Sequence, residues 1–240
     1  MPFIGKEPSP DLAATGDLGD DIVTLAKIAS GTDGELITWD ASGNPAAVGA
    51  GTSGHFLKSQ GAGSVPVFAA AGGAWSYVST ATASNSATLD FTNMASGYDY
   101  KYMVDYMIMA ADNKYFDLRL GVAGPTYRTS GYLGVVRNSA GSISSAATGE
   151  IRLVGASAGI GNAANENLWG AEVILSNPAS ATYKTTVMGR AGFGDNGGTP
   201  KTNYSAGNYT TAEANTCARF FAHVGNISSG TILQYRRSRT

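Results

Sequence analysis

The groups that could carry out acid–base or metal chemistry are few and scattered. The chain has two histidines, His55 and His223, and neither has a histidine, cysteine or carboxylate nearby at the spacing of a metal-binding motif. A catalytic triad needs a nucleophile, a histidine and an acid in one cleft, and distance in sequence does not exclude that arrangement. No Gly-x-Ser-x-Gly elbow is expected at a strand-to-helix turn. We therefore predict no catalytic residue and no metal site.

Paired carboxylates could serve a glycosidase, and two pairs are candidates: Asp99 with Asp105, and Asp112 with Asp117. Arg119 lies two residues from Asp117 on the same strand face, and an ion pair explains that placement more simply. The segment 155–161 is rich in glycine but lacks the Gly-Lys-Ser/Thr of a phosphate-binding loop, so a β-turn is the better interpretation. We expect a protein that is not an enzyme and uses no cofactor.

Aromatic side chains give the strongest indication of binding. Tyrosine and tryptophan rings stack on the apolar faces of sugars, and their polar groups reach the hydroxyl rim. Four such residues lie among small polar ones in the C-terminal half: Trp169, Tyr183, Tyr204 and Tyr209. The alternative is that these rings fill a core or an interface between copies of the chain.

Residues 191–210 form the longest stretch without a strand pattern, so we predict a surface loop there. Small polar residues would supply adaptable hydrogen bonds, and tyrosines would supply rigid contact area. The candidate receptor-binding residues in this stretch are Phe193, Asp195, Lys201, Tyr204 and Tyr209. An equally weighted alternative is that the stretch packs against a neighbouring protomer.

The elements that must position these residues read as strands. Between 98 and 109 the side chains alternate, which places Tyr98, Tyr100, Tyr102, Val104, Tyr106 and Ile108 on one face. Turns rich in glycine, asparagine and serine recur through the rest of the chain, and no long helical pattern appears. The fold class predicted for residues 74–240 is an all-β, jelly-roll-like antiparallel sandwich.

A short unit precedes residues 74–240, the predicted head, and occurs twice. Residues 31–48 and 51–68 each contain a Gly-Thr-x-Gly turn, a short apolar strand, a Gly/Ser turn and a second short strand. A two-strand unit of this size has one small apolar face and nothing to cover it. We therefore expect residues 31–73, a neck that ends in the linker 69–73, to need a partner.

The tandem unit, with the segment Leu25–Ser30 before it, resembles the necks of tailed-bacteriophage fibre and receptor-binding proteins. The resemblance covers roughly residues 1 to 70, and a short echo occurs in the final strand at 229–236. It implies a homotrimeric virion appendage that is made in the host cytoplasm, anchored to other virion proteins by its N-terminus, and tipped by a β-sandwich head.

The composition agrees with a partner-dependent protein. Charged residues make up 14% of the chain and the net charge is −2, so much of the surface is neutral. The absence of a basic stripe disfavours nucleic acid as a partner, and no stretch reaches the length needed for membrane insertion. Residues 1–6 have no apolar run behind them, so a signal peptide is not expected. Cys217 is the only cysteine, and we expect a buried thiol.

Residues 1–30 are expected to anchor the protein to the virion, with Phe3 and Ile4 as the candidate docking side chains. The prediction is a non-enzymatic homotrimeric fibre that recognises a host-surface glycan or protein through its head. A capsid decoration protein without a receptor role is one alternative, and a carbohydrate-processing β-sandwich enzyme is another. The arginines at 236, 237 and 239 are expected to be a solvated basic end.

Overall fold

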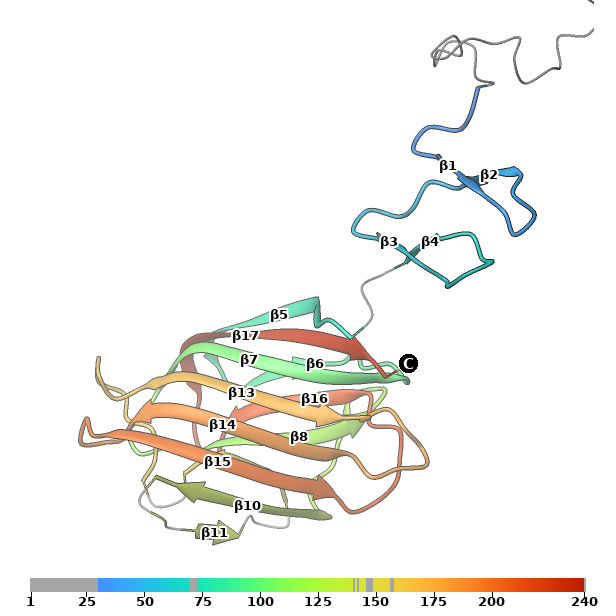
Figure 1. Ribbon diagram of the computed structural model, residues 1–240. Coiled ribbons are helices and arrows are strands. Elements are labelled where there is room, and N and C mark those ends of the chain that lie inside the picture. Colours follow the sequence, from blue (N-terminus) through green and yellow to red (C-terminus); the bar gives the residue numbers. More distant parts are fainter. Residues whose placement is uncertain are drawn as a thin grey trace, which may run out of the picture. The chain divides into compact units, whose positions relative to one another are not determined.

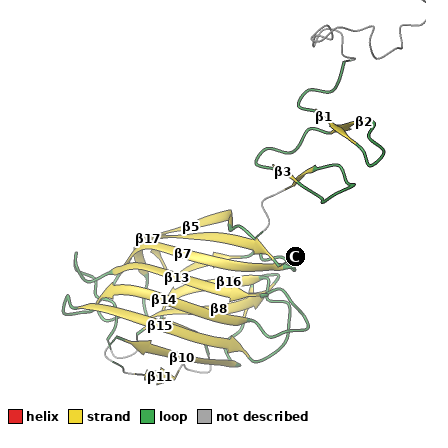
Figure 2. Cartoon of the chain, viewed as in Figure 1, coloured by secondary structure: helices red, strands yellow, loops and turns green. Residues whose placement is uncertain are grey.

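The computed structural model describes residues 30–69, 73–139, 141, 143–145, 149–155 and 158–239. The chain divides into two compact units between residues 71 and 72. The sequence analysis placed this boundary two residues later, after residue 73. Every regular element in the described residues is a strand (Figure 2), which confirms the all-β prediction. None of these residues forms a helix long and apolar enough to cross a membrane.

The first unit contains two small antiparallel hairpins. Strand β1 (Leu36–Trp39) pairs with β2 (Pro45–Val48), and β3 (Phe56–Lys58) pairs with β4 (Val67–Ala69). The turns that precede β1 and β3 are equivalent: Glu35 N–H donates to the Thr32 carbonyl at 3.1 Å, and His55 N–H donates to the Thr52 carbonyl at 2.9 Å. Gly34 and Gly54 take the positive φ values, 81° and 84°, that these turns require. The sequence repeat is therefore also a structural repeat.

The second unit, the head, is a β-sandwich of an eight-stranded and a five-stranded sheet (Figure 1). The larger sheet runs, in spatial order, β11 (Ile143–Ser145), β10 (Tyr132–Asn138), β15 (Pro200–Tyr209), β14 (Thr186–Gly194), β13 (Leu168–Ser176), β7 (Tyr98–Met109), β17 (Ile227–Ser238) and β5 (Ser76–Ser86). The smaller sheet runs β12 (Ile151–Val154), β8 (Phe116–Val122), β16 (Cys217–Ala222) and β6 (Thr88–Phe91), and β9 (Thr126–Tyr127) pairs with β8.

Eight of these strands have the connectivity of a jelly roll. Hydrogen-bonded pairs are nested along the chain: β5 pairs with β17, β6 with β16, β7 with β13, and β8 with β12. A long hairpin rolled into two sheets produces this nesting, with its last strand beside its first. Strands β14 and β15 extend the larger sheet beyond β13, and β10 and β11 extend it further. The jelly-roll-like sandwich predicted for the head is confirmed.

Aromatic rings join the two sheets. The ring of Phe220 on β16 lies 4.9 Å from that of Tyr102 on β7 and 5.8 Å from that of Phe116 on β8, and Phe91 on β6 also contacts Tyr102. The hydroxyl of Tyr102 accepts a hydrogen bond from Gln234 Nε2 at 3.0 Å, so its polar atom is satisfied inside the core. Burial raises the pKa of Tyr102 far above its usual value. These contacts hold the closing strand β17 against the core.

The predicted alternation of β7 fails at its second half. Tyr100, Tyr102 and Val104 are buried as expected, but Met107 and Met109 take the inward positions that follow. Tyr106, predicted to face inward, is 42% exposed. The register between β7 and β17 shifts next to Gly230, whose φ is 138° and which lies too close to the Tyr106 carbonyl for a side chain. A bulge of this kind moves the following side chains to the opposite face.

Two of the three C-terminal arginines, predicted as a solvated basic end, are instead bound to a buried carboxylate. Arg237 Nη2 lies 2.8 Å from Asp99 Oδ2, and Arg239 Nη1 lies 2.5 Å from Asp99 Oδ1. The Asn177 N–H donates to the same carboxylate at 3.0 Å. Asp99, at the start of β7, is buried, and it fastens the end of β17 to its neighbour. We refer to Asp99, Arg237 and Arg239 as the C-terminal clamp.

The clamp predicts that stability depends on pH. Burial alone would raise the pKa of Asp99, but the two arginines and the Asn177 amide outweigh it and hold the pKa below its usual value of 3.8. The stabilisation is therefore complete above the usual value and is lost as the pH falls through the lower folded-state value. In urea unfolding, Asp99→Asn is expected to lower stability by about 2 kcal/mol at neutral pH. The difference from wild type should shrink as the pH falls below the usual carboxyl value of 3.8; a constant difference would contradict the clamp.

Candidate functional site

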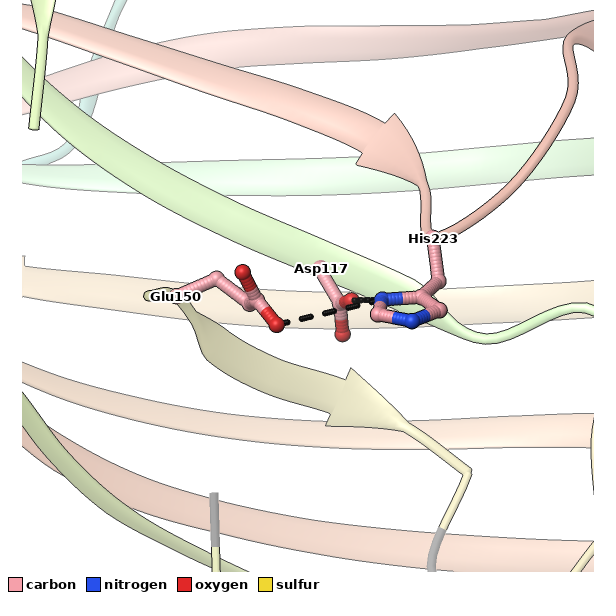
Figure 3. A group of neighbouring side chains, drawn as sticks. All are labelled: Asp117, Glu150 and His223. Atoms are coloured by element: carbon pink, nitrogen blue, oxygen red, sulfur yellow. Dashed lines mark hydrogen bonds and ion pairs between the residues drawn. The ribbon is translucent and has the colours of Figure 1, made fainter. Parts of the chain in front are cut away.

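Three titratable side chains from distant parts of the chain meet on the outer side of the five-stranded sheet (Figure 3). Asp117 lies on β8, Glu150 immediately precedes β12, and His223 immediately follows β16. His223 Nδ1 lies 3.1 Å from Asp117 Oδ2 and 3.8 Å from Glu150 Oε1. Candidate ligand atoms of the three groups lie within 4.8 Å of one another. We call Asp117, Glu150 and His223 the carboxylate–histidine cluster.

Two arginines already neutralise the carboxylates of this cluster. Arg152 is the direct cross-strand partner of Asp117, with Nε 3.2 Å from Oδ1. Arg119 Nη2 lies 3.0 Å from Glu150 Oε2. Both guanidinium groups also lie over rings, Arg152 over Tyr115 and Arg119 over Phe221. The ion pair predicted for Asp117 therefore forms, but with Arg152 instead of Arg119.

The cluster has the geometry of a packed ionic network. The Asp117 side chain is fully buried, and burial raises its pKa while the nearby Arg152 opposes the shift. A cation at the cluster would compete with arginines for the carboxylate oxygens. In the described part of the chain, the hydrogen bonds of His223 go to Asp117 and Arg152 and none goes to a serine or threonine hydroxyl. Among the described residues the cluster is therefore a set of ion pairs, with an arginine on each of its two carboxylates.

A second feature lies on the outer face of the eight-stranded sheet. An open hollow of about 360 Å³ lies over strands β7, β13, β14 and β15 and is lined by their side chains. Its floor includes Gly170 and Gly192, which face each other across β13 and β14. Met103 and Tyr204 line it on opposite sides, and the ion-paired Glu172 and Arg190 line it between them. We call this feature the outer-face hollow.

The candidate receptor-binding residues separate in the structure. Residues 191–210, predicted as a loop, are the end of β14, a turn, and the whole of β15. Phe193 is 1% exposed and Tyr209 is 7% exposed, so neither presents its ring to a ligand. Both rings belong to the core between the sheets. Only Tyr204 of this set combines an exposed ring, at 62%, with a place in the hollow.

Asp195 and Lys201 have a local structural role. The Asp195 carboxylate accepts hydrogen bonds from the Gly197 and Thr199 N–H groups, at 3.0 and 2.8 Å, and shapes the turn between β14 and β15. Lys201 Nζ lies 3.5 Å from the same carboxylate. Burial opposes the effect of these donors, yet the pKa of Asp195 is lowered. These contacts explain both residues without a ligand.

Other aromatic and terminal candidates have mixed positions. Tyr183 and Trp169 are exposed, and Trp169 borders the hollow: its Cε3 lies 3.9 Å from the place of a Cβ on Gly192. Cys217 is buried as expected, and its thiol donates to the Val122 carbonyl. Phe3 and Ile4, the predicted docking side chains, lie outside the described residues.

The ionic network predicts unequal losses on substitution. Arg152→Met should lower the unfolding free energy by about 3 kcal/mol, because it leaves the Asp117 carboxylate buried without its cation. His223→Ala should cost less than about 1 kcal/mol, because the imidazole is half-exposed. Arg219→Met is a matched control on the same sheet, where Arg219 pairs with the more exposed Asp90. Equal losses for Arg152→Met and Arg219→Met, in urea unfolding, would contradict the network.

Comparisons with known proteins assign no family to the chain. No family model matches it, and neither a curated protein nor a solved structure matches it. The case for a function therefore depends on the sequence and on the geometry of the two units.

Proposed function

We propose that the chain is the subunit of a homotrimeric virion appendage, a short fibre of a tailed bacteriophage. Its N-terminal residues attach to other virion proteins, its hairpin neck assembles with copies of itself, and its head recognises a host-surface glycan or protein. In this role the protein is not an enzyme. The resemblance of residues 31–68 to phage fibre necks supplies the class of particle.

The exposed apolar side chains of the neck carry this proposal. Ile37 and Trp39 on β1 are 61% and 65% exposed, and Phe56 on β3 is 64% exposed. Val48 is the only hydrophobic residue of the described neck, 30–69, that is buried within the single chain. An isolated hairpin of this size is marginally stable in water. Threefold association would let each copy cover its neighbours' apolar faces.

The head suits recognition better than catalysis. Jelly rolls occur in viral capsid proteins and lectins, and this analogy of fold raises the expectation of a binding role. The carboxylates of the carboxylate–histidine cluster are bound by arginines. The outer-face hollow offers an open surface with aromatic and polar groups.

A capsid decoration protein remains the competing function, because the exposed hairpins could equally pack along a shell. A fibre and a decoration protein differ in where the head lies relative to the particle. Electron microscopy of intact particles would show a projecting knob for a fibre and a flat density for a decoration protein. Failure to find the chain in any particle would contradict both.

The neck predicts the oligomeric state. Light scattering of the full chain should give the mass of a trimer, and Trp39→Ser with Phe56→Ser should shift it to monomer, because both rings lose their apolar contacts. Thr38→Ser on β1 with Ser59→Ala, directly after β3, is a control for substitution in both hairpins without loss of an apolar ring. A wild-type monomer with an intact neck would contradict the proposal.

The anchoring role predicts a separable defect. Deletion of residues 1–19 should leave the trimer and its thermal unfolding unchanged, because this segment has little core-forming pattern. The truncated protein should no longer be incorporated into particles, as measured by immunoblotting of purified virions. Normal incorporation would contradict the assignment of the anchor, and failure to fold would make the segment structural.

A further inference from the structure

We propose that the outer-face hollow is a binding site for a neutral pyranose of a surface glycan. The inference deepens the proposed recognition role and depends on it. The hollow lies in the middle of the outer face of the eight-stranded sheet, across β7, β13, β14 and β15, which Figure 1 shows side by side in the front layer. Its volume of about 360 Å³ falls within the range of small-molecule sites in proteins.

Two glycines whose presence the fold does not require form the floor. A Cβ on Gly192 would meet no atom closer than 3.9 Å, and one on Gly170 none closer than 3.5 Å. Neither residue has the positive φ that favours glycine. By contrast, a Cβ on Gly207 or Gly194 would collide with backbone atoms at 2.6 and 2.1 Å. Glycine inside a strand weakens it and marks places where a ligand or another backbone comes close.

The walls of the hollow match the two faces of a sugar. Tyr204 projects from β15 with a largely exposed ring, and the Met103 side chain lies opposite on β7. Ring faces and thioether groups contact the C–H side of a pyranose. The Glu172–Arg190 pair supplies planar acceptor and donor groups for neighbouring hydroxyls, and Thr202 adds an exposed hydroxyl.

The charges beside the hollow favour a neutral ligand. Arg190 Nη2 lies 2.6 Å from Glu172 Oε2, and Lys101 Nζ lies 4.0 Å from Glu172 Oε1. The exposed carboxylate of Asp105, on the same strand as Lys101, makes two cations and two anions in this region. An anionic sugar would have to draw Arg190 away from Glu172, whereas a neutral one can add hydrogen bonds to the intact pair.

The outer face of a sheet with exposed apolar residues could also meet a second copy of the chain. A contact between copies would need a broad complementary surface, and the glycine-floored hollow would leave a void in it unless a side chain of the partner filled it. The experiment therefore measures the mass of the oligomer and saccharide binding on the same variants.

The test uses the full-length protein on an array of neutral hexose, 6-deoxyhexose and N-acetylhexosamine oligosaccharides, with uronic-acid oligosaccharides beside them. The best binder is then titrated by calorimetry. Gly192→Thr fills the hollow at a position with open space and a cross-strand threonine, Thr202, as neighbour. Tyr204→Ala removes the exposed ring. Ala206→Thr and Tyr183→Ala are the matched controls, because neither residue lines the hollow.

The proposal expects binding of a neutral oligosaccharide, its loss in Gly192→Thr, and an affinity at least about tenfold weaker in Tyr204→Ala. Both controls should bind as wild type does, and all variants should keep their unfolding temperature. Binding only to uronic-acid oligosaccharides, or binding unchanged by Gly192→Thr, would overturn the site. A change in the mass of the oligomer in Gly192→Thr would also overturn the site, because the face would then be a contact between subunits. A correct trimer that binds no array saccharide would overturn this inference and leave the fibre assignment intact, whereas a monomer would count against the fibre.

Discussion

The head is closed by its last strand. Strand β17 pairs with β5 on one side and β7 on the other, so the larger sheet is continuous only when the C-terminal residues are in place. Gln234 on β17 donates a hydrogen bond to Tyr102 in the aromatic core, and Arg237 near the end of β17 forms an ion pair with Asp99. Pairing of the first and last strands has a high cost in loop closure, because about 140 residues separate them. An ion pair to the buried Asp99 carboxylate and a core hydrogen bond at the closing strand make the long-range pairing specific.

The two outer faces of the sandwich differ in chemistry. On the five-stranded sheet the charged residues interlock: Arg219 with Asp90, Arg119 with Glu150, and Arg152 with Asp117. Side chains that are occupied in this way have little left to offer a partner. The eight-stranded sheet instead presents Met188, Tyr204 and Leu133 to solvent. The same face also carries Glu172 with its ion-pair partners Arg190 and Lys101, so apolar and charged side chains lie beside one another on it. Apolar exposure of this kind is typical of surfaces that meet a ligand or a partner.

Alternation and turn composition were sufficient to predict the fold class, and β7 and β8 appear where these patterns place them. Strand β15 was missed because its inward positions are occupied by Asn203, Ser205 and Gly207, which give no apolar signal. Asn203 is buried because its Oδ1 accepts a hydrogen bond from Gly155 N–H, a contact 48 residues away. The carboxylate–histidine cluster was also missed, since pairing of β8 with β12 and β16 brings its members together across more than a hundred residues. Local patterns do not contain pairing of this kind.

Both units expose apolar side chains that the single chain does not cover. Each neck hairpin is too small to bury its own apolar side chains, and the outer face of the head's larger sheet exposes Met188, Tyr204 and Leu133 to solvent. The remedies differ with geometry. Exposed rings such as Trp39 and Phe56 can be covered by identical rings from other copies, which a symmetric oligomer provides. A concave hollow floored by glycines cannot be filled by flat association and suits a small ligand. Assembly at one unit would then raise the avidity of weak binding at the other, because several copies of the hollow would act on one host surface.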